Sequence, residues 1–221
     1  MRNKFDMQLQ LLEEQLTHMG ELCEIAIAKA TKALKEGSPE QARAIMAADE
    51  EIDQIEKDIE RLCLKLLLQQ QPVAKDLRRI SAALKMITDM ERIGDQTSDI
   101  AEIVISSGNN TAVDIKEIGT MAAAASKMVR DSVTAYVSKD LELAESVMKA
   151  DDVVDELFNT IRDELIRYIR AEKGENGGNI FDLIMVTKYL ERIGDHATNI
   201  AEWVEFSITG VHRNNAVLEE K

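Results

Sequence analysis

Apolar residues recur three and four positions apart along most of the chain, which is the spacing of α-helices that bury one face. Between residues 5 and 35 this series includes Leu9, Leu12, Leu16, Met19 and Cys23. Gly37, Ser38 and Pro39 then supply a helix stop, an N-cap and a first-turn proline. A second helix is predicted from there to about residue 70, and Pro72 ends it and opens a third.

The second part of the chain repeats this organisation. Residues 106–110 predict a linker, and helices follow over 115–137, from 139–140 to about 168, and from the loop at 174–178 to about 210, with a frayed tail to 221. Six long helices predict an all-α fold of two pseudo-symmetric three-helix bundles, residues 1–108 and 109–221.

One stretch occurs twice. LKMITDMERIGDQTSDIA begins at Leu84 and IMVTKYLERIGDHATNIA begins at Ile184, and both copies continue to Ile-Ala-Glu. A repeat of this length in a chain of 221 residues predicts two versions of one structural unit.

Composition and charge narrow the function classes. The chain is 45% hydrophobic but only 4% aromatic, as is typical of helical bundles, and its formal net charge of −14 argues against nucleic acid and against unassisted docking on anionic membranes. Cys23 and Cys63 form no CxxC pattern and are predicted to be buried and reduced. With no apolar signal segment or membrane span in the pattern, we expect a soluble cytoplasmic protein.

The acidic residues of the repeat fall on the apolar seam of their helix. In steps of three and four the seam runs Leu77, Ile80, Leu84 and Ile87, and then Glu91, Gly94/Asp95, Ser98/Asp99 and Glu102. Carboxylates on a core stripe repel one another and are costly to bury unless a cation is supplied. The pattern therefore predicts that these acids meet a positive charge.

Further acids lie four apart on the second helix of each half, in ADEEID and ADDVVD. Such pairs project from one helix face, and short connections favour neighbouring helices, so each half is expected to bring two pairs together. The candidate metal ligands are Asp49, Asp53, Glu91, Asp95 and Asp99 in the first half and Asp151, Asp155, Glu191 and Asp195 in the second, where Asn199 replaces Asp99.

Oxygen ligands of this kind suit Mg, Ca, Mn or Fe, with Zn possible. The alternative is that the acids are solvated or paired with lysine and arginine; Arg92 and Arg192 are expected to pair with neighbouring acids, although an anion is a second option. Gly94 and Gly194 lie in the middle of predicted helices, where glycine is unfavourable. They indicate one of two things: a backbone that closely approaches a metal cluster or a partner helix, or tight packing between helices. His196 is expected to be a surface or packing residue.

Enzyme chemistry has little support in these residues. The chain has no glycine-rich phosphate loop, no Ser/His/Asp set and no cysteine–histidine nucleophile. None of His18, His196 and His212 has glutamate three residues before it, which disfavours a ferritin-like di-iron enzyme.

Taken together, the doubled ERIGD…IAE, ADEEID and ADDVVD, the opening MRNKF with MGELCEIAIAKATKAL, and QQPVAKDLRRI resemble the PhoU family of phosphate-transport accessory proteins over nearly the whole chain. The resemblance implies a PhoU-like fold of two three-helix bundles, a homodimer, and iron or zinc clusters held by the acidic motifs. It also implies a regulatory role with a phosphate ABC transporter and a sensor histidine kinase, damping phosphate uptake and phosphate-starvation signalling when phosphate is plentiful. Asn199 departs from the pattern, so the second site is expected to be weaker or to hold fewer ions.

Three hypotheses about function follow. The first is a non-enzymatic, metal-binding regulatory adaptor of phosphate uptake. The second is an enzyme with a carboxylate-bridged metal centre, acting in hydrolysis or oxygen chemistry. The third is a purely structural helical protein with solvated acids.

Overall fold

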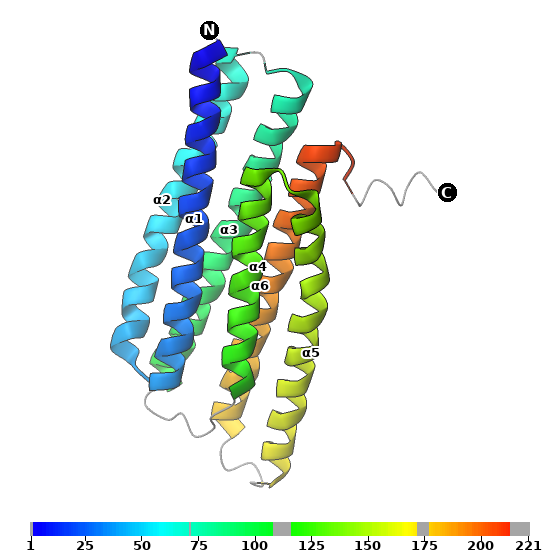
Figure 1. Ribbon diagram of the computed structural model, residues 1–221. Coiled ribbons are helices and arrows are strands. Elements are labelled where there is room, and N and C mark those ends of the chain that lie inside the picture. Colours follow the sequence, from blue (N-terminus) through cyan, green and yellow to red (C-terminus); the bar gives the residue numbers. More distant parts are fainter. Residues whose placement is uncertain (1, 71, 108–115, 172–176, 213–221) are drawn as a thin grey trace.

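Six long helices make up the described part of the chain (Figure 1). The computed structural model describes residues 2–70, 72–107, 116–171 and 177–212. Its helices are α1 (Arg2–Glu36), α2 (Pro39–Gln70), α3 (Ala74–Ser107), α4 (Lys116–Ser138), α5 (Leu141–Ala171) and α6 (Gly177–Thr209). No strand occurs in these ranges, so the predicted all-α fold is confirmed. The longest helix has 35 residues and spans about 50 Å.

Local signals determine several helix ends. Gly37 ends α1 with a φ of 57°, a left-handed conformation that glycine adopts without strain. The Gln41 amide donates to the Ser38 hydroxyl at 3.4 Å, and the Leu143 amide donates to Asp140 at 3.0 Å. The stop and cap predicted before α2 and the predicted start of α5 are therefore confirmed.

Two predicted loops differ from the structure. Ser106 and Ser107 still belong to α3, and Gly177 and Gly178 already belong to α6. A stretch rich in serine or glycine need not end a helix when the apolar periodicity continues beside it. The proposed boundary between residues 108 and 109, the loop residues 174–176 and the tail after 212 lie outside the described residues.

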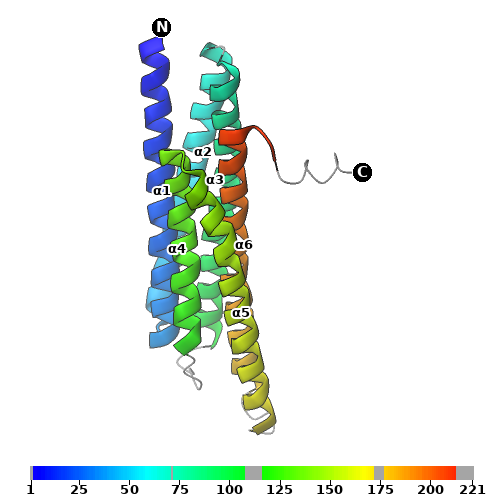
Figure 2. The same cartoon turned by 45° about the vertical axis from the view of Figure 1, so that its right-hand side comes forward.

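The two halves pack side by side along their length. α1, α2 and α3 contact one another, as do α4, α5 and α6, and the halves join mainly through α3 against α6 and through α1 against α4. Figure 2 shows that they are staggered, with α1, α2 and α3 extending past α4 at one end and α5 and α6 extending past it at the other. α3 and α6, which carry the two repeated motifs, therefore also form the junction.

A hydrogen-bonded network crosses the junction through α4. The buried Tyr136 hydroxyl donates to the Arg79 carbonyl of α3 at 2.8 Å, and the Arg79 guanidinium pairs with Glu13 of α1. This network ties three helices from both halves together.

Both cysteines lie in the core as free thiols, as predicted. Burial raises the pKa of Cys23 and of Cys63 to about 12. The Cys23 thiol lies 3.4 Å from the Met90 carbonyl, to which it donates. Protonated, inaccessible thiols are poor metal ligands and poor nucleophiles.

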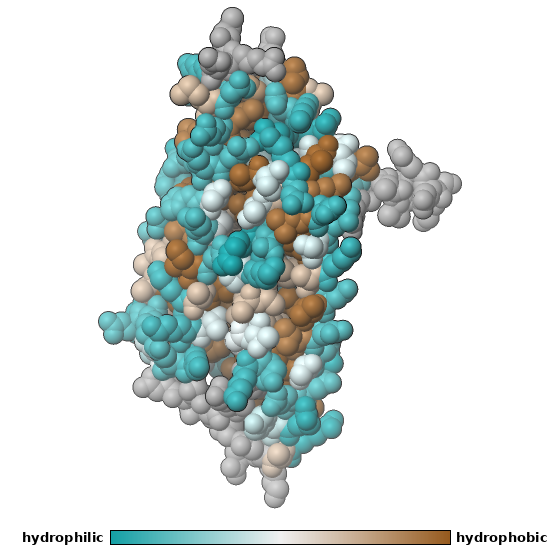
Figure 3. Space-filling view, viewed as in Figure 1, coloured by the Kyte–Doolittle hydropathy of each residue, from teal (hydrophilic) through white to brown (hydrophobic). Residues whose placement is uncertain are grey.

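The face formed by α1, α4 and α5 is mostly hydrophilic, with apolar side chains surfacing in separate places (Figure 3). None of the described helices contains a stretch long and apolar enough to cross a bilayer.

Candidate metal centres

The predicted seam of α3 is confirmed for Ile80, Ile87 and Gly94, which are buried, and is wrong for the acids, which do not continue the core stripe. Leu77, which the prediction placed on that seam, is 47% exposed, and Glu91, Asp95 and Asp99 are only half-buried. The buried seam runs Ile80, Ala83, Ile87, Met90, Gly94, Thr97 and Ala101. Because α1, α2 and α6 all pack against α3, its buried face is broad, and the acids stand at its edge beside α2.

The first cluster forms across the contact between α2 and α3. The Ser98 hydroxyl of α3 donates to Asp49 Oδ2 of α2 at 2.8 Å. Burial raises the pKa of Asp49, the bond from Ser98 opposes this, and the charges of Asp95, Asp53 and Asp99 raise the pKa further. The predicted acids of the first half therefore lie near one another.

Glu91 belongs to the same cluster and has one neighbour that the prediction missed. Burial raises the pKa of Glu91, and the charges of Asp95, Glu56 and Asp53 raise it further. Burial also raises the pKa of Glu56 itself. Glu56 follows Asp49 by seven residues, two helical turns along the same face of α2, and this spacing was the signal that could have identified it.

The second cluster lies between α5 and α6. Burial raises the pKa of Asp151 to about 6, with the charges of Asp195 and Asp155 as the next causes, while Thr198 opposes the rise. Burial and then the charge of Glu191 raise the pKa of Asp195. The second predicted set is therefore also brought together, but Asp155 and Asp195 are exposed, whereas all five acids of the first set are half-buried.

Gly94 and Gly194 allow close helix contact at the two clusters. A Cβ at residue 94 would stand 2.5 Å from Asp49 Oδ1 and 3.2 Å from Ile52 Cδ1. At residue 194 the nearest atom would be Val154 Cγ1, at 3.2 Å. Both glycines thus serve tight helix packing, and Gly94 also leaves room for a carboxylate over the α3 backbone.

Basic side chains pair with several of these acids. Arg92 lies 2.9 Å from Asp95 and 3.5 Å from Glu91, which confirms the predicted ion pair, and Lys188 pairs with Glu191. Within the described ranges, no three histidine, cysteine, aspartate or glutamate side chains converge closely enough to hold an ion. The oxygen donors fit a metal ion in their chemistry, and binding requires them to leave these partners.

His196 connects α6 to α3. Its Nδ1 lies 2.9 Å from Asp89 Oδ1, and the Asn199 amide donates to the same oxygen at 3.1 Å. Both the His196 ring and the Asp89 carboxylate are largely buried. His196 is therefore a packing residue, which was one of the two predicted alternatives, the other being a surface position. Asp89 was missed because this contact depends on the register of two helices far apart in sequence.

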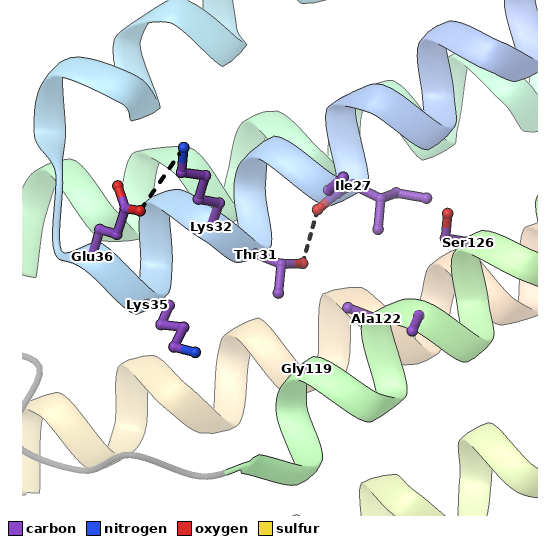
Figure 4. A pocket seen from close by; sticks show the side chains of 10 residues that line it. Ile27, Thr31, Lys32, Lys35, Glu36, Gly119, Ala122 and Ser126 are labelled. Atoms are coloured by element: carbon purple, nitrogen blue, oxygen red, sulfur yellow. Dashed lines mark hydrogen bonds and ion pairs between the residues drawn. The ribbon is translucent and has the colours of Figure 1, made fainter.

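A groove of about 600 Å³ lies between α1 and α4 (Figure 4). Its lining is largely apolar and small, with Lys32 and Lys35 among the polar residues. Lys32 pairs with Glu36 at 3.9 Å, and the Thr31 hydroxyl donates to the Ile27 carbonyl at 2.8 Å. The groove contains none of the candidate ligands.

Known proteins match both halves. The family model described as the PhoU domain matches residues 16–104 and again residues 118–204. A phosphate-specific transport system accessory protein PhoU homolog of Clostridium acetobutylicum is 37% identical and covers 95% of this chain and 96% of its own length. The homolog of Caulobacter vibrioides is 34% identical, over 92% of this chain and 89% of its own.

Solved structures agree with the fold. The crystal structure of PhoU from Pseudomonas aeruginosa superposes with a TM-score of 0.87 at 32% identity, covering 94% of this chain and all of that one. The phosphate transport system regulatory protein PhoU from Streptococcus pneumoniae gives 0.86 at 27% identity, over 94% and 98% of the two chains. These names describe accessory and regulatory proteins.

Proposed function

The chain belongs to the PhoU family, and we propose on this basis that it is a regulatory adaptor that lowers phosphate uptake and phosphate-starvation signalling when phosphate is plentiful. In this proposal it acts in the cytoplasm, as a homodimer, with a phosphate ABC transporter and a sensor histidine kinase, and meets the membrane only through them. The observation that carries the proposal is the match of both halves to the PhoU domain, together with relatives named for phosphate-specific transport.

The shape and charge of the molecule support an adaptor. Long helices offer extended faces to partner helices, and the net charge of −14 opposes direct adsorption to anionic lipid.

A deletion strain tests the regulatory role. We expect cells without the protein, grown in excess phosphate, to take up labelled phosphate faster and to express a phosphate-starvation reporter, and the wild-type gene to reverse both. Unchanged uptake and unchanged reporter activity would refute the proposal. Co-purification from membranes, with a charge-matched unrelated helical protein as control, tests association with transporter and kinase subunits.

We further propose that both acidic clusters bind metal ions, with Fe or Zn favoured and Mn, Mg or Ca chemically suitable. The ligands in this proposal are Asp49, Asp53, Glu91, Asp95 and Asp99, and Asp151, Asp155, Glu191 and Asp195. The proposal is supported by the gathering of like charges at partly buried positions, which a cation stabilises. A bound metal would supply charge neutralisation and cross-link neighbouring helices.

Elemental analysis of protein purified without added metal or chelator tests this proposal. We expect Fe, Zn or Mn near stoichiometric amounts in the wild type and a loss in Glu91→Ala/Glu191→Ala. Glu50→Ala is the matched control, because Glu50 is exposed on α2. A wild type that holds no metal after incubation with each ion would refute metal binding.

A further inference from the structure

We propose that the two acidic clusters are inequivalent: the first binds divalent cations more tightly, and the second binds them more weakly because Lys188 acts there as a built-in counter-ion. This inference rests on the metal binding proposed above. It follows from comparing equivalent positions, meaning those that hold the same place in the two copies of the repeat.

The first difference lies on α2 and α5. Glu56 joins the first cluster, where its charge contributes to the raised pKa of Glu91. The equivalent position in the second half is Phe158, which offers no oxygen donor. The second cluster therefore lacks this carboxylate and has an aromatic ring in its place.

The second difference lies on α3 and α6, one turn before the repeated glutamates. Thr88 is neutral, and its hydroxyl donates to the Leu84 carbonyl of its own helix at 3.4 Å. Lys188 stands at the equivalent position, pairs with Glu191, and has its Nζ 5.5 Å from the centre of the Phe158 ring. An ammonium over an aromatic face gains cation–π stabilisation, so the ring that replaces a carboxylate also holds the lysine.

The third difference removes another ligand from the second cluster. Asp99 contributes to the first cluster, while the equivalent Asn199 donates its amide to Asp89 across the junction at 3.1 Å. Its side chain is thus engaged with α3.

Counting charge at five of the positions that differ between the halves gives the direction of the asymmetry. The pairs are Glu56/Phe158, Lys57/Asn159, Glu60/Arg162, Thr88/Lys188 and Asp99/Asn199. They carry −2 in the first half and +2 in the second, a difference of four charges. A divalent cation is therefore attracted more strongly to the first cluster, between α2 and α3.

Among the described residues, three cations stand near the first cluster: Arg92, Lys57, which is already counted above, and the exposed Arg192 of α6, whose charge acts on Asp99. Arg92 pairs with Asp95 and Glu91 with its side chain 57% exposed, and Lys57 lies 3.7 Å from Asp53 with its side chain 54% exposed. Exposed pairs of this kind contribute little, so a divalent ion can displace them. Lys188 is 44% exposed and Glu191 is 16% exposed, against 57% for Arg92 and 23% for Glu91, so the pair at the second cluster is somewhat better shielded from water.

Exchanging the two residues between the halves tests the inference. The variants are Thr88→Lys, Lys188→Thr and the double exchange, which conserves net charge and total composition. Lys32→Thr is the control, because Lys32 lines the separate groove between α1 and α4. Metal-free protein is titrated with MnCl₂ by calorimetry, and hydrogen–deuterium exchange with and without Mn²⁺ locates the ion.

In the wild type we expect Mn²⁺-dependent protection in α2 and α3 with little in α5 and α6. Thr88→Lys should weaken Mn²⁺ binding at the first cluster about tenfold, and Lys188→Thr should strengthen binding at the second cluster by about as much. The double exchange should move the protection to α5 and α6. Equal protection of both halves, or affinities that none of the exchanges change, would overturn the inference while leaving metal binding intact. A wild type that binds no Mn²⁺ by either method would overturn both.

Discussion

Replacing Gly94 with alanine tests how closely α2 and α3 approach at the first cluster. In an unobstructed helix the change would stabilise the protein by about 1 kcal/mol, because alanine loses less backbone entropy. Here the new Cβ would stand 2.5 Å from Asp49 Oδ1 and 3.2 Å from Ile52 Cδ1. The carboxylate must therefore move away from the α3 backbone.

The expected cost follows from the bond that this movement breaks. The Ser98 hydroxyl donates to Asp49 at 2.8 Å, and a hydrogen bond to a charged group contributes about 1.5–3 kcal/mol. Subtracting the gain in helix propensity of about 1 kcal/mol leaves Gly94→Ala destabilised by about 0.5–2 kcal/mol. At Gly194 the nearest contact is Val154 Cγ1 at 3.2 Å, so a shift of a few tenths of an ångström suffices, and the change should be close to neutral.

Urea unfolding followed by circular dichroism measures this difference, in EDTA so that no metal contributes. Gly119→Ala is the positive control, because nothing lies within 4 Å of a Cβ there, and it should be stabilising or neutral. If Gly94→Ala were as stable as Gly194→Ala, with an unchanged urea dependence, the close approach of Asp49 to the α3 backbone would be refuted.

Three further predictions concern single side chains. The pKa of Asp151 in the folded protein, about 6, exceeds its ordinary value of 3.8, so folding favours the protonated acid and stability falls as pH rises through this window. In metal-free protein, Asp151→Asn should therefore raise the free energy of unfolding by about 1–2 kcal/mol at pH 8 and by little at pH 3.5. An equal effect at both pH values would contradict the raised pKa. Asp89→Ala should lower stability by about 1–2 kcal/mol, and a double-mutant cycle with His196→Ala should show coupling; strict additivity would argue against their contact. Tyr136→Phe should lower the free energy of unfolding by about 1 kcal/mol, because it deletes the bond to the Arg79 carbonyl. This loss should be seen as a lower melting temperature, and an unchanged melting temperature would contradict the bond.

The helices were predictable because their signals are local. Apolar spacing identified all six, and Gly37, Ser38 and Asp140 marked their ends by side-chain and backbone preferences that act within one turn. Ser107 misled the prediction because its hydroxyl donates to Asp182 of α6 at 2.7 Å, a contact between distant segments that no local preference indicates.

The grouping of the acids was predictable, but their depth was not. Spacing by four placed Asp49 with Asp53 and Glu91 with Asp95, and neighbouring helices brought the pairs together. Which arc of a helix is buried depends on the helices around it, and α1, α2 and α6 all pack against α3. A single-helix periodicity cannot contain this information, so the acids were placed on the core seam rather than at its edge.

Contacts between helices distant in sequence were the least predictable. The Asp89–His196 contact and the Tyr136–Arg79 bond depend on helix register across the junction, and no pattern within either helix specifies it. Lys188 could have been noticed by aligning the two copies of the repeat, where it stands opposite Thr88.

The central position of α3 has a consequence for how the chain is made. During synthesis α1, α2 and α3 can assemble early through contacts between sequence neighbours, but the partner that covers the remaining face of α3 is completed only when residue 209 leaves the ribosome. A nascent chain that stalls before then presents uncovered apolar surface to chaperones and to other nascent chains. Each copy of the repeat is thus complete as a sequence, but the apolar surface of the first copy is fully covered only after the second copy has been translated.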